Sequence, residues 1–258
     1  MAAPRPLIGL VPAAGRATRL GDISGCKELL RVPGPAGDGE QRPVAEYLLR
    51  AMAQAGVERA YIVLRHGKWD IPARFGPALP DGPRLAYLVT PGTASIPATL
   101  DVAYPFVRDA NVVTGFPDSC FTPGDAVARA VCRHLTGGAG VTLALFRSDR
   151  PDKTDMVELD GGRVSGFRVK PGPSELEYTF GAAVWGPELT EFMHALLAQR
   201  EASAGEKLTY SELQISEVLG AALAAGIVID ADISPAGRYV DVGTPEDLAR
   251  VRRTGAAD

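Results

Sequence analysis

The sequence has few cysteines and few histidines. Its three cysteines, Cys26, Cys120 and Cys132, are odd in number and lack the spacing of metal ligands. A disulfide framework and a zinc site are therefore disfavoured, and reduced thiols in a cytoplasm are the simplest account. Cys26 lies beside Lys27, which could lower the pKa of its thiol, although most such thiols are only packed. The chain also has only three histidines, which leaves few groups for acid–base chemistry near neutral pH.

The sequence also lacks long apolar runs and a large excess of one charge. No apolar stretch approaches the roughly 20 residues of a membrane-spanning helix. The first apolar stretch is broken by Gly9 and Pro12 and is interpreted as a strand, not a signal peptide. The net charge of −4 argues against a general surface for nucleic acid or anionic membranes. With 46% hydrophobic and 22% charged residues, the 258-residue chain can build a sizeable core, in one large α/β domain or two small ones.

Two common glycine-rich phosphate-binding motifs are missing from the start of the chain. Gly15 is not followed by glycines at the offsets of the dinucleotide fingerprint, and no Gly-Lys-Ser/Thr closes a Walker A loop. A dinucleotide-dependent oxidoreductase is therefore disfavoured.

The stretch from residue 7 to residue 30 instead combines a strand, small residues and cations. An apolar run leads into Ala13, Ala14 and Gly15, and Arg16, Arg19 and Lys27 follow. Small residues allow a backbone to approach a ligand closely, and N–H groups in such a turn attract anions. Arginine and lysine add charge that suits phosphate oxygens. The stretch predicts a polyphosphate-binding loop, although any parallel α/β protein can have a glycine turn after its first strand.

Apolar periodicity predicts alternating strands and helices along the rest of the chain. The segment 32–42 is rich in proline and glycine and is expected to lie on the surface. The segment 155–169 predicts a hairpin that turns at Gly161 and Gly162. Further strands are expected at 60–64, 84–89, 111–115, 141–146, 179–185 and 227–233, and helices at 43–56, 98–107, 125–135, 187–200, 210–225 and near the end, with a short helix ending near residue 76.

One carboxylate follows a predicted strand. Asp118 comes after the apolar run at 111–115. In open α/β sheets, ligands bind at the carboxyl ends of the strands, and Mg²⁺ prefers one or two carboxylates together with phosphate oxygens. Asp118 is preferred over Asp125, which lies beyond a proline and a glycine. The alternative is that Asp118 only caps the next turn.

The motifs at the two ends of the chain resemble those of one family, the sugar-1-phosphate nucleotidyltransferases (the glucose-1-phosphate thymidylyltransferase-like pyrophosphorylases). The resemblance rests on Ala13-Ala14-Gly15-x-x-Thr18-Arg19-Leu20, Lys27-x-Leu29-Leu30 and Tyr239-x-Asp241-x-Gly243-Thr244-Pro245. It implies a Rossmann-like, mostly parallel central sheet flanked by helices, with an antiparallel sugar-binding lobe. It also implies a single domain, with residues 1–136 mainly binding nucleotide and 137–258 mainly binding the acceptor.

The resemblance also implies roles for individual residues. Two would be catalytic, Arg19 and Lys27, and two would bind Mg²⁺, Asp118 and Asp241. Lys170 and Gly181 would contact the acceptor. The nucleotide would be bound by Ala13, Ala14, Gly15, Arg16, Thr18, Thr90 and Ser95.

The sequence departs from the family pattern at several positions. Ala17 stands where a second glycine is usual, and Val169 stands where the family has a glutamate that holds sugar hydroxyls. Thr90 stands near a position where the family has a glutamine that helps to read the base, and Ser95 near a usual glycine. The resemblance therefore leaves the nucleobase and the acceptor open.

The implied activity is transfer of a nucleoside monophosphate from a nucleoside triphosphate to a sugar 1-phosphate, with release of pyrophosphate. The expected enzyme is cytoplasmic, serves sugar-nucleotide biosynthesis and has no nucleic-acid or membrane partner; a homo-oligomer is left open. A phosphate monoester is already ionised near neutral pH, so no general base is needed, in keeping with the few histidines. Two alternatives are a non-sugar phosphate acceptor, such as a phosphorylated alcohol or aminoalcohol, and a non-catalytic domain that binds nucleotides or sugar nucleotides.

Overall fold

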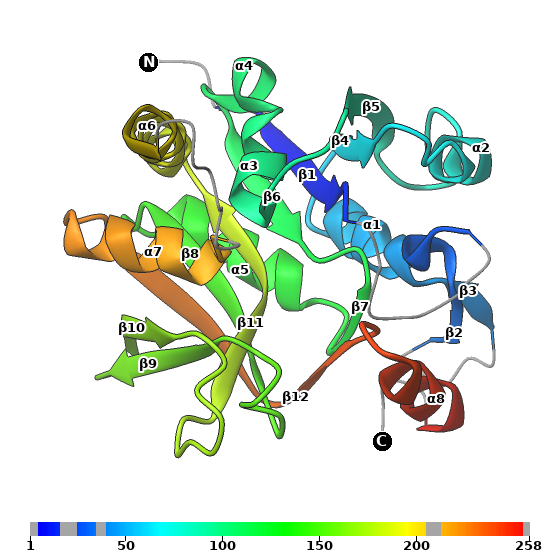
Figure 1. The fold of residues 1–258 in the computed structure, drawn as a ribbon. Coiled ribbons are helices and arrows are strands. Elements are labelled where there is room, and N and C mark those ends of the chain that lie inside the picture. Colours follow the sequence, from blue (N-terminus) through cyan, green and yellow to red (C-terminus); the bar gives the residue numbers. More distant parts are fainter. Residues whose placement is uncertain (1–4, 16–24, 35–39, 205–212, 255–258) are drawn as a thin grey trace.

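A mostly parallel sheet runs through the centre of the molecule, flanked by helices, as the alternating patterns predict (Figure 1). The computed structural model of the protein describes residues 5–15, 25–34, 40–204 and 213–254. Within these residues, no helix is long and apolar enough to cross a membrane.

The sheet is continuous through eight strands, and a hairpin is attached to it. In spatial order the eight are β5 (Arg84–Thr90), β4 (Arg59–Arg65), β1 (Leu7–Ala13), β6 (Asn111–Gly115), β11 (Tyr178–Trp185), β8 (Val141–Arg147), β12 (Ile229–Asp241) and β7 (Ser119–Thr122). The neighbours from β5 to β6, and also β8 and β12, run parallel, whereas β11 and β7 run antiparallel to their neighbours.

The hairpin forms where the glycine turn predicts it. Its strands are β9 (Met156–Asp160) and β10 (Arg163–Arg168), and β9 also pairs with β11. Gly161 and Gly162 both have positive φ, at 56° and 83°. A two-residue loop with two positive φ angles matches the twist of the flanking strands, which is why glycine is favoured there.

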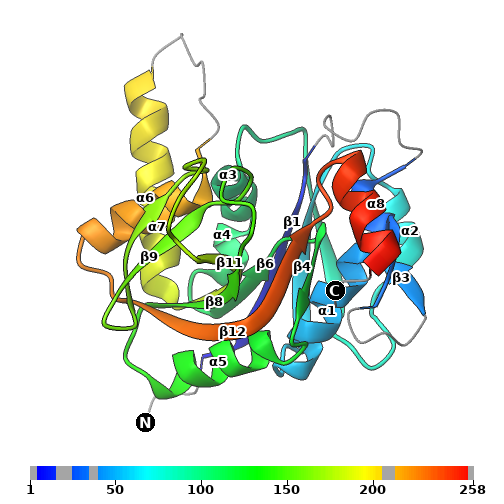
Figure 2. The ribbon, with the colours of Figure 1, turned by 90° about the horizontal axis from the view of Figure 1, so that it is seen from below.

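The helices cover both faces of the sheet (Figure 2). One face is covered by α1 (Val44–Gln54) and α5 (Ala126–Thr136), and the other by α3 (Ile96–Asp101), α4 (Tyr104–Val107), α6 (Pro187–Ala204) and α7 (Ile215–Ala224). The remaining helices are α2 (Asp70–Phe75), α8 (Pro245–Thr254) and a short 3₁₀ helix, η2 (Lys27–Leu29). Each face has its own apolar core, as expected for a sheet buried on both sides.

Local sequence explains where several helices begin and end. The expected helix at 43–56 is α1, and Gly56 follows it with φ at 85°, a conformation in which glycine is favoured after a helix. Before α8, Thr244 accepts a hydrogen bond from the backbone N–H of Asp247, as its capping motif predicts.

Four predicted elements need correction. The helix expected at 98–107 is two short helices, α3 and α4, with a proline in the first turn of α4, where the missing N–H and the ring disfavour a continuous helix. The described part of the helix expected at 210–225 begins only at Ile215, because Gln214 has extended backbone angles and forms a capping box with Glu217. The last strand extends to Asp241, well beyond the expected 227–233.

The fourth correction concerns the surface segment at 32–42. Its described ends form a small antiparallel sheet of β2 (Arg31–Pro33) and β3 (Gln41–Pro43). Strand β7 was not predicted at all. Its four residues are too few to show the alternation that marks a strand.

Candidate active site

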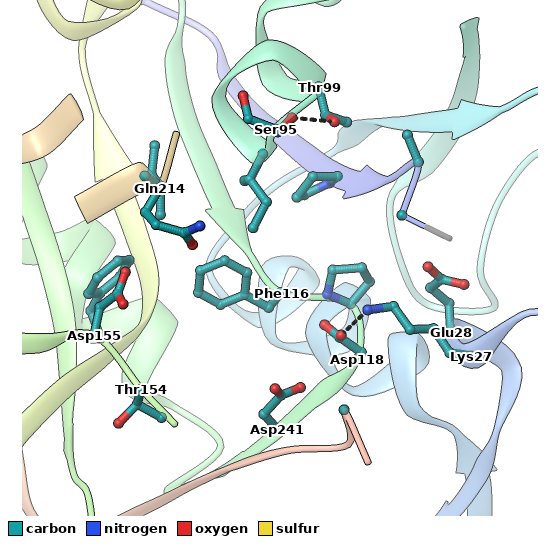
Figure 3. Close-up of a pocket in the computed structure, with 18 of the residues that line it drawn as sticks. Lys27, Glu28, Ser95, Thr99, Phe116, Asp118, Thr154, Asp155, Gln214 and Asp241 are labelled. Carbon is teal, nitrogen blue, oxygen red and sulfur yellow. Dashed lines mark hydrogen bonds and ion pairs between the residues drawn. The ribbon is translucent and has the colours of Figure 1, made fainter. Parts of the chain in front are cut away.

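A cavity of about 780 Å³ opens where the parallel strands end (Figure 3). This is the edge of an open α/β sheet at which ligands bind. The walls come from segments far apart in the chain: the end of β1, η2, the turn after β6, the segment before β9, β11 and the end of β12. The lining residues used below are Ala14, Gly15, Lys27, Glu28, Arg65, Ser95, Phe116, Asp118, Lys153, Thr154, Asp155, Lys170, Thr179, Phe180, Gln214, Ile215, Tyr239, Asp241 and Gly243.

Lys27 and Asp118 form an ion pair in this cavity (Figure 3). Lys27 lies in η2, and Asp118 lies in the turn between β6 and β7. Burial alone would lower the pKa of Lys27, but the carboxylate of Asp118, supported by Glu28 and Asp241, outweighs it and raises the pKa above its ordinary value. Lys27 is therefore a fixed positive charge throughout the physiological pH range.

The pairing of β7 with β12 brings the second carboxylate beside the first. Ser119 of β7 lies opposite Asp241 of β12, and the N–H of Val242 donates to the carbonyl oxygen of Asp118 at 2.8 Å. A Cβ at Gly243 would lie 2.8 Å from Oδ2 of Asp241. The glycine therefore leaves room for this carboxylate in the conformation that it adopts.

The two carboxylates give this part of the cavity an oxygen-only donor set, which suits Mg²⁺. Among the residues that the structure describes, no three His, Cys, Asp or Glu side chains gather as a metal cluster. Asp118 and Asp241 therefore suit a cation that takes its other ligands from phosphate oxygens and water, as Mg²⁺ commonly does.

The predicted phosphate loop is described only at its two ends. Ala14 and Gly15 line the cavity, whereas Ala13 is buried and is not among the described lining residues. Arg16, Ala17, Thr18 and Arg19 lie outside the described residues.

An ion pair that sequence reasoning missed joins the two described ends. Lys68 donates from Nζ to the carbonyl oxygen of Ala13 at 2.9 Å and to Oε1 of Glu28 at 2.7 Å. Glu28 is only 1% exposed, and its Oε2 has no hydrogen-bond partner among the described residues. No sequence pattern links Lys68 with Glu28, because 40 residues separate them and the contact exists only in the folded chain.

Of the two residues predicted to lie beside the nucleobase, only one lines the cavity. Ser95 lines the cavity and caps α3 by accepting from the N–H of Ala98 at 3.3 Å. Thr90 is buried, accepts a hydrogen bond from the N–H of Gly92 and does not line the cavity. Arg65, which was not predicted, does line it and donates from Nε to the carbonyl oxygen of Ala14 at 3.2 Å.

Of the two residues predicted to contact the acceptor substrate, one lines the cavity and the other does not. Lys170 lines the cavity and has a positive φ of 38°. Gly181 does not line it: the strand pairing shifts register beside this residue, and a Cβ there would lie 2.7 Å from the ring of Tyr239. Gly181 is therefore a close-approach glycine that supports the wall of the cavity. Val169 is 44% exposed and is not among the described residues that line the cavity.

The three cysteines are all free. Burial raises the pKa of the Cys26 thiol despite the nearby Lys68, and it raises that of Cys120 to about 12. Neither is therefore a reactive thiolate near neutral pH.

Comparison with known proteins gives structural matches only. No protein-family model matches the chain, and no curated protein matches it by sequence. A structure from Bacillus anthracis, provisionally assigned as a glucose-1-phosphate thymidylyltransferase and solved in complex with a sucrose, is similar with a TM-score of 0.79 at 20% identity, over 98% of this chain and 96% of that one. The inositol-1-phosphate CTP transferase from T. maritima is similar with a TM-score of 0.70 at 18% identity, over 99% and 96%.

A third similar structure is a UTP-bound UGPase from Acinetobacter baumannii, with a TM-score of 0.77 at 16% identity, over 96% of this chain and 92% of that one. The likeness extends over nearly the whole length of all three proteins. It shows that the chain has their fold, the Rossmann-like fold expected from the two end motifs.

Proposed function

We propose that the protein is a nucleotidyltransferase that transfers a nucleoside monophosphate from a nucleoside triphosphate to a sugar 1-phosphate, forming a nucleoside-diphosphate sugar and pyrophosphate. The observation that carries this proposal is the convergence of Lys27, Asp118 and Asp241 in one cavity (Figure 3). Lys27 and Asp241 belong to the motifs that suggested the activity, and Asp118 follows a predicted strand. The three residues come from distant segments of the chain. The three similar structures are described as proteins of the same reaction class, which supports the proposal.

The reaction needs charge neutralisation before any other chemistry. An oxygen of the acceptor phosphate attacks the α-phosphorus, the bond from that phosphorus to the oxygen bridging to the β-phosphorus breaks, and pyrophosphate leaves. Attacker and target are both anions, so positioned positive charge and in-line placement provide the rate enhancement. The acceptor phosphate is already ionised near neutral pH, so no side chain has to remove a proton from it.

Lys27 supplies the fixed cation of this scheme. Its ammonium stabilises the charge that develops on the α-phosphoryl group, and its contact with Asp118 orients that carboxylate. Asp118 and Asp241 would hold Mg²⁺, which when bound neutralises charge on the α-phosphate. Lys170 would hold the acceptor phosphate, and Arg19 would hold the leaving pyrophosphate.

The rest of the site is divided between the two substrates. Ala14, Gly15 and Ser95 would lie against the nucleotide, together with Arg16 and Thr18. We assign residues 1–136 mainly to the nucleotide and 137–258 mainly to the acceptor, within one domain. We also place the enzyme in the cytoplasm, because its three cysteines are free thiols.

The test is release of pyrophosphate from each common nucleoside triphosphate with Mg²⁺ and a panel of phosphorylated acceptors. We expect release that requires both substrates and yields one nucleoside-diphosphate product per pyrophosphate, measured by mass spectrometry. The panel contains sugar 1-phosphates, a cyclitol phosphate and aminoalcohol phosphates, so it also tests the alternative of a non-sugar acceptor. If a nucleoside triphosphate binds tightly but no combination of triphosphate and acceptor releases pyrophosphate, the proposal is contradicted and a non-catalytic domain is favoured.

Removing the charge of Asp241 should strongly reduce this activity. We expect Asp241→Asn to lower kcat/KM by roughly 100-fold or more, because the metal loses one of its two carboxylates. The matched control is Asp109→Asn, since the side chain of Asp109 is 92% exposed and Asp109 is not among the described residues that line the cavity. Full activity of Asp241→Asn with Mg²⁺ would show that the metal assignment is wrong.

A further inference from the structure

Asp155 lies in the wall of the cavity, and one of its carboxylate oxygens is buried without a hydrogen-bond partner among the described residues. The residue precedes β9 and lines the cavity. Its Oδ2 accepts a hydrogen bond from Oγ of Ser216. Its Oδ1 is buried and has no hydrogen-bond partner among the described residues. Figure 3 shows Asp155 with Thr154 and Gln214 on one side of the cavity and Lys27 with Glu28 on the other, with Phe116 between them.

The position of this carboxylate is fixed from two directions. Ser216 lies in the first turn of α7 and holds Oδ2. The hydroxyl of Thr179, at the start of β11, donates to the carbonyl oxygen of Asp155 at 2.8 Å. The helix therefore holds the side chain and the strand holds the backbone of Asp155. A residue that is already ordered meets a ligand with little loss of entropy.

The neighbouring hydroxyl groups are already used by the protein. Thr154 donates to the carbonyl oxygen of Arg150 at 3.0 Å, and Thr179 donates to Asp155 itself. Oδ1 of Asp155 is therefore a hydrogen-bond acceptor that this part of the fold leaves unused. A buried acceptor without a donor is costly, and more so when it is charged, so a donor on a ligand at this place would be strongly favoured.

The surroundings indicate what kind of ligand group fits. Phe116 and Phe180 line the same cavity with their ring centroids 6.0 Å apart, and Ile215 adds an apolar side chain. Lys170 supplies a positive charge for a phosphate. A phosphorylated ring with hydroxyl groups matches this combination, because its carbon face suits the aromatic wall and its hydroxyls are donors.

We propose that Asp155 accepts a hydrogen bond from a hydroxyl group of the acceptor and so determines acceptor specificity. The preferred acceptors are polyhydroxylated monophosphates with a free hydroxyl at the carbon that faces Oδ1. This inference rests on the proposed function. It adds a residue that the sequence motifs did not assign, in the segment between β8 and β9. A site built to pair with a hydroxyl rejects the analogue that lacks it, because its own polar group is then left unpaired.

The test compares acceptors with and without single hydroxyl groups, using the wild type and two variants. For the best acceptor found with the wild type, each monodeoxy analogue is measured. We expect one analogue to lose roughly 100-fold or more in kcat/KM with the wild type. In Asp155→Asn and Asp155→Ala, the kcat/KM for the parent acceptor should fall by a similar factor and the preference over that analogue should largely disappear. The KM for the nucleoside triphosphate should change by less than about twofold, since Asp155 lies on the acceptor side.

The matched control is Asp160→Asn, which makes the same change at the exposed far end of β9 and should leave all these constants unchanged. Asp155→Asn keeps the shape of the side chain, so it decides the matter if Asp155→Ala fails to fold, as judged by circular dichroism. Wild-type discrimination that persists in the Asp155 variants would overturn this inference and leave the proposed function intact. A wild type without activity on any pair would instead overturn the proposed function.

Discussion

Lys68 is the residue that connects two parts of the cavity wall. Its ammonium contacts the carbonyl oxygen of Ala13, at the end of β1, and the carboxylate of Glu28, in η2. These contacts lie on either side of residues 16–24, so one cation fixes the two ends of the predicted phosphate loop. The side chains of Lys68 and Glu28 are 12% and 1% exposed, and solvent therefore screens this pair less than a surface pair.

Removing Lys68 should destabilise the fold and weaken nucleotide binding. In Lys68→Met the buried carboxylate of Glu28 loses its partner, and we expect the free energy of unfolding to fall by about 3–5 kcal/mol. Chemical denaturation measures this change. The double variant Lys68→Met with Glu28→Gln should recover much of the loss, because the unpaired charge is removed.

The control for this prediction is Arg108→Met, which breaks an exposed ion pair with Asp109. We expect it to change the stability by less than about 1 kcal/mol. Equal effects of Lys68→Met and Arg108→Met would show that the Glu28 pair does not hold the loop ends.

At the scale of elements, the sequence predicted the units whose patterns are local. The hairpin at Gly161 and Gly162 and the helix α1 depend on contacts within a few residues, and both were confirmed. Strand β7 was missed because its four residues show no alternation, and its pairing with β12 joins segments about 120 residues apart. That pairing also brings Asp241 next to Asp118, so the sequence could indicate both carboxylates but not how they meet.

The same distinction explains which site residues were found. Lys27 and Asp241 stand in motifs and Asp118 follows an apolar run; all three were predicted, and the structure brings them to one cavity. Asp155 and Lys68 stand in no motif, and their importance comes from tertiary contacts with Ser216 and Glu28. Thr90 and Gly181 were predicted from the resemblance alone, and neither lines the cavity.

Helix α5 carries a histidine that should make stability depend on pH. His134 is buried against β8, where Nδ1 lies 3.3 Å from the hydroxyl of Thr142. Burial lowers the pKa of His134 in the folded state. The unfolded chain therefore binds a proton more readily, so the histidine's contribution to stability is present above its ordinary pKa of about 6.5 and is lost as the pH falls below it.

We expect His134→Gln to make the free energy of unfolding less dependent on pH between about 7 and 5. Urea denaturation at several pH values measures this dependence. The control is His66→Gln, since His66 is exposed. An unchanged pH dependence in His134→Gln would contradict the assignment.

At the scale of the whole molecule, the cavity takes its walls from segments spread along most of the chain, from Pro12 to Gly243. Both halves of the chain contribute, with Lys27 and Asp118 from the first half and Asp155, Lys170 and Asp241 from the second. A ligand that fills the cavity therefore contacts segments that are remote in sequence, and its binding should stabilise the fold as a unit.

We expect the preferred nucleoside triphosphate with Mg²⁺ to raise the thermal midpoint of unfolding. At a ligand concentration of 100 times Kd, the stabilisation is about 2.7 kcal/mol. The ranking of the triphosphates in this measurement identifies the base without any acceptor. Lys27→Met should reduce the shift, and Asp160→Asn should not. No shift with any triphosphate at millimolar concentration would contradict nucleotide binding in this cavity.

The path of β12 has a consequence for the order in which the protein is made. This strand begins beside β8 and ends beside β7, where it delivers Asp241. During translation, Lys27 and Asp118 leave the ribosome long before Asp241 has been synthesised. The proposed magnesium site is therefore incomplete in the growing polypeptide until Asp241 has been added and β12 has paired with β7.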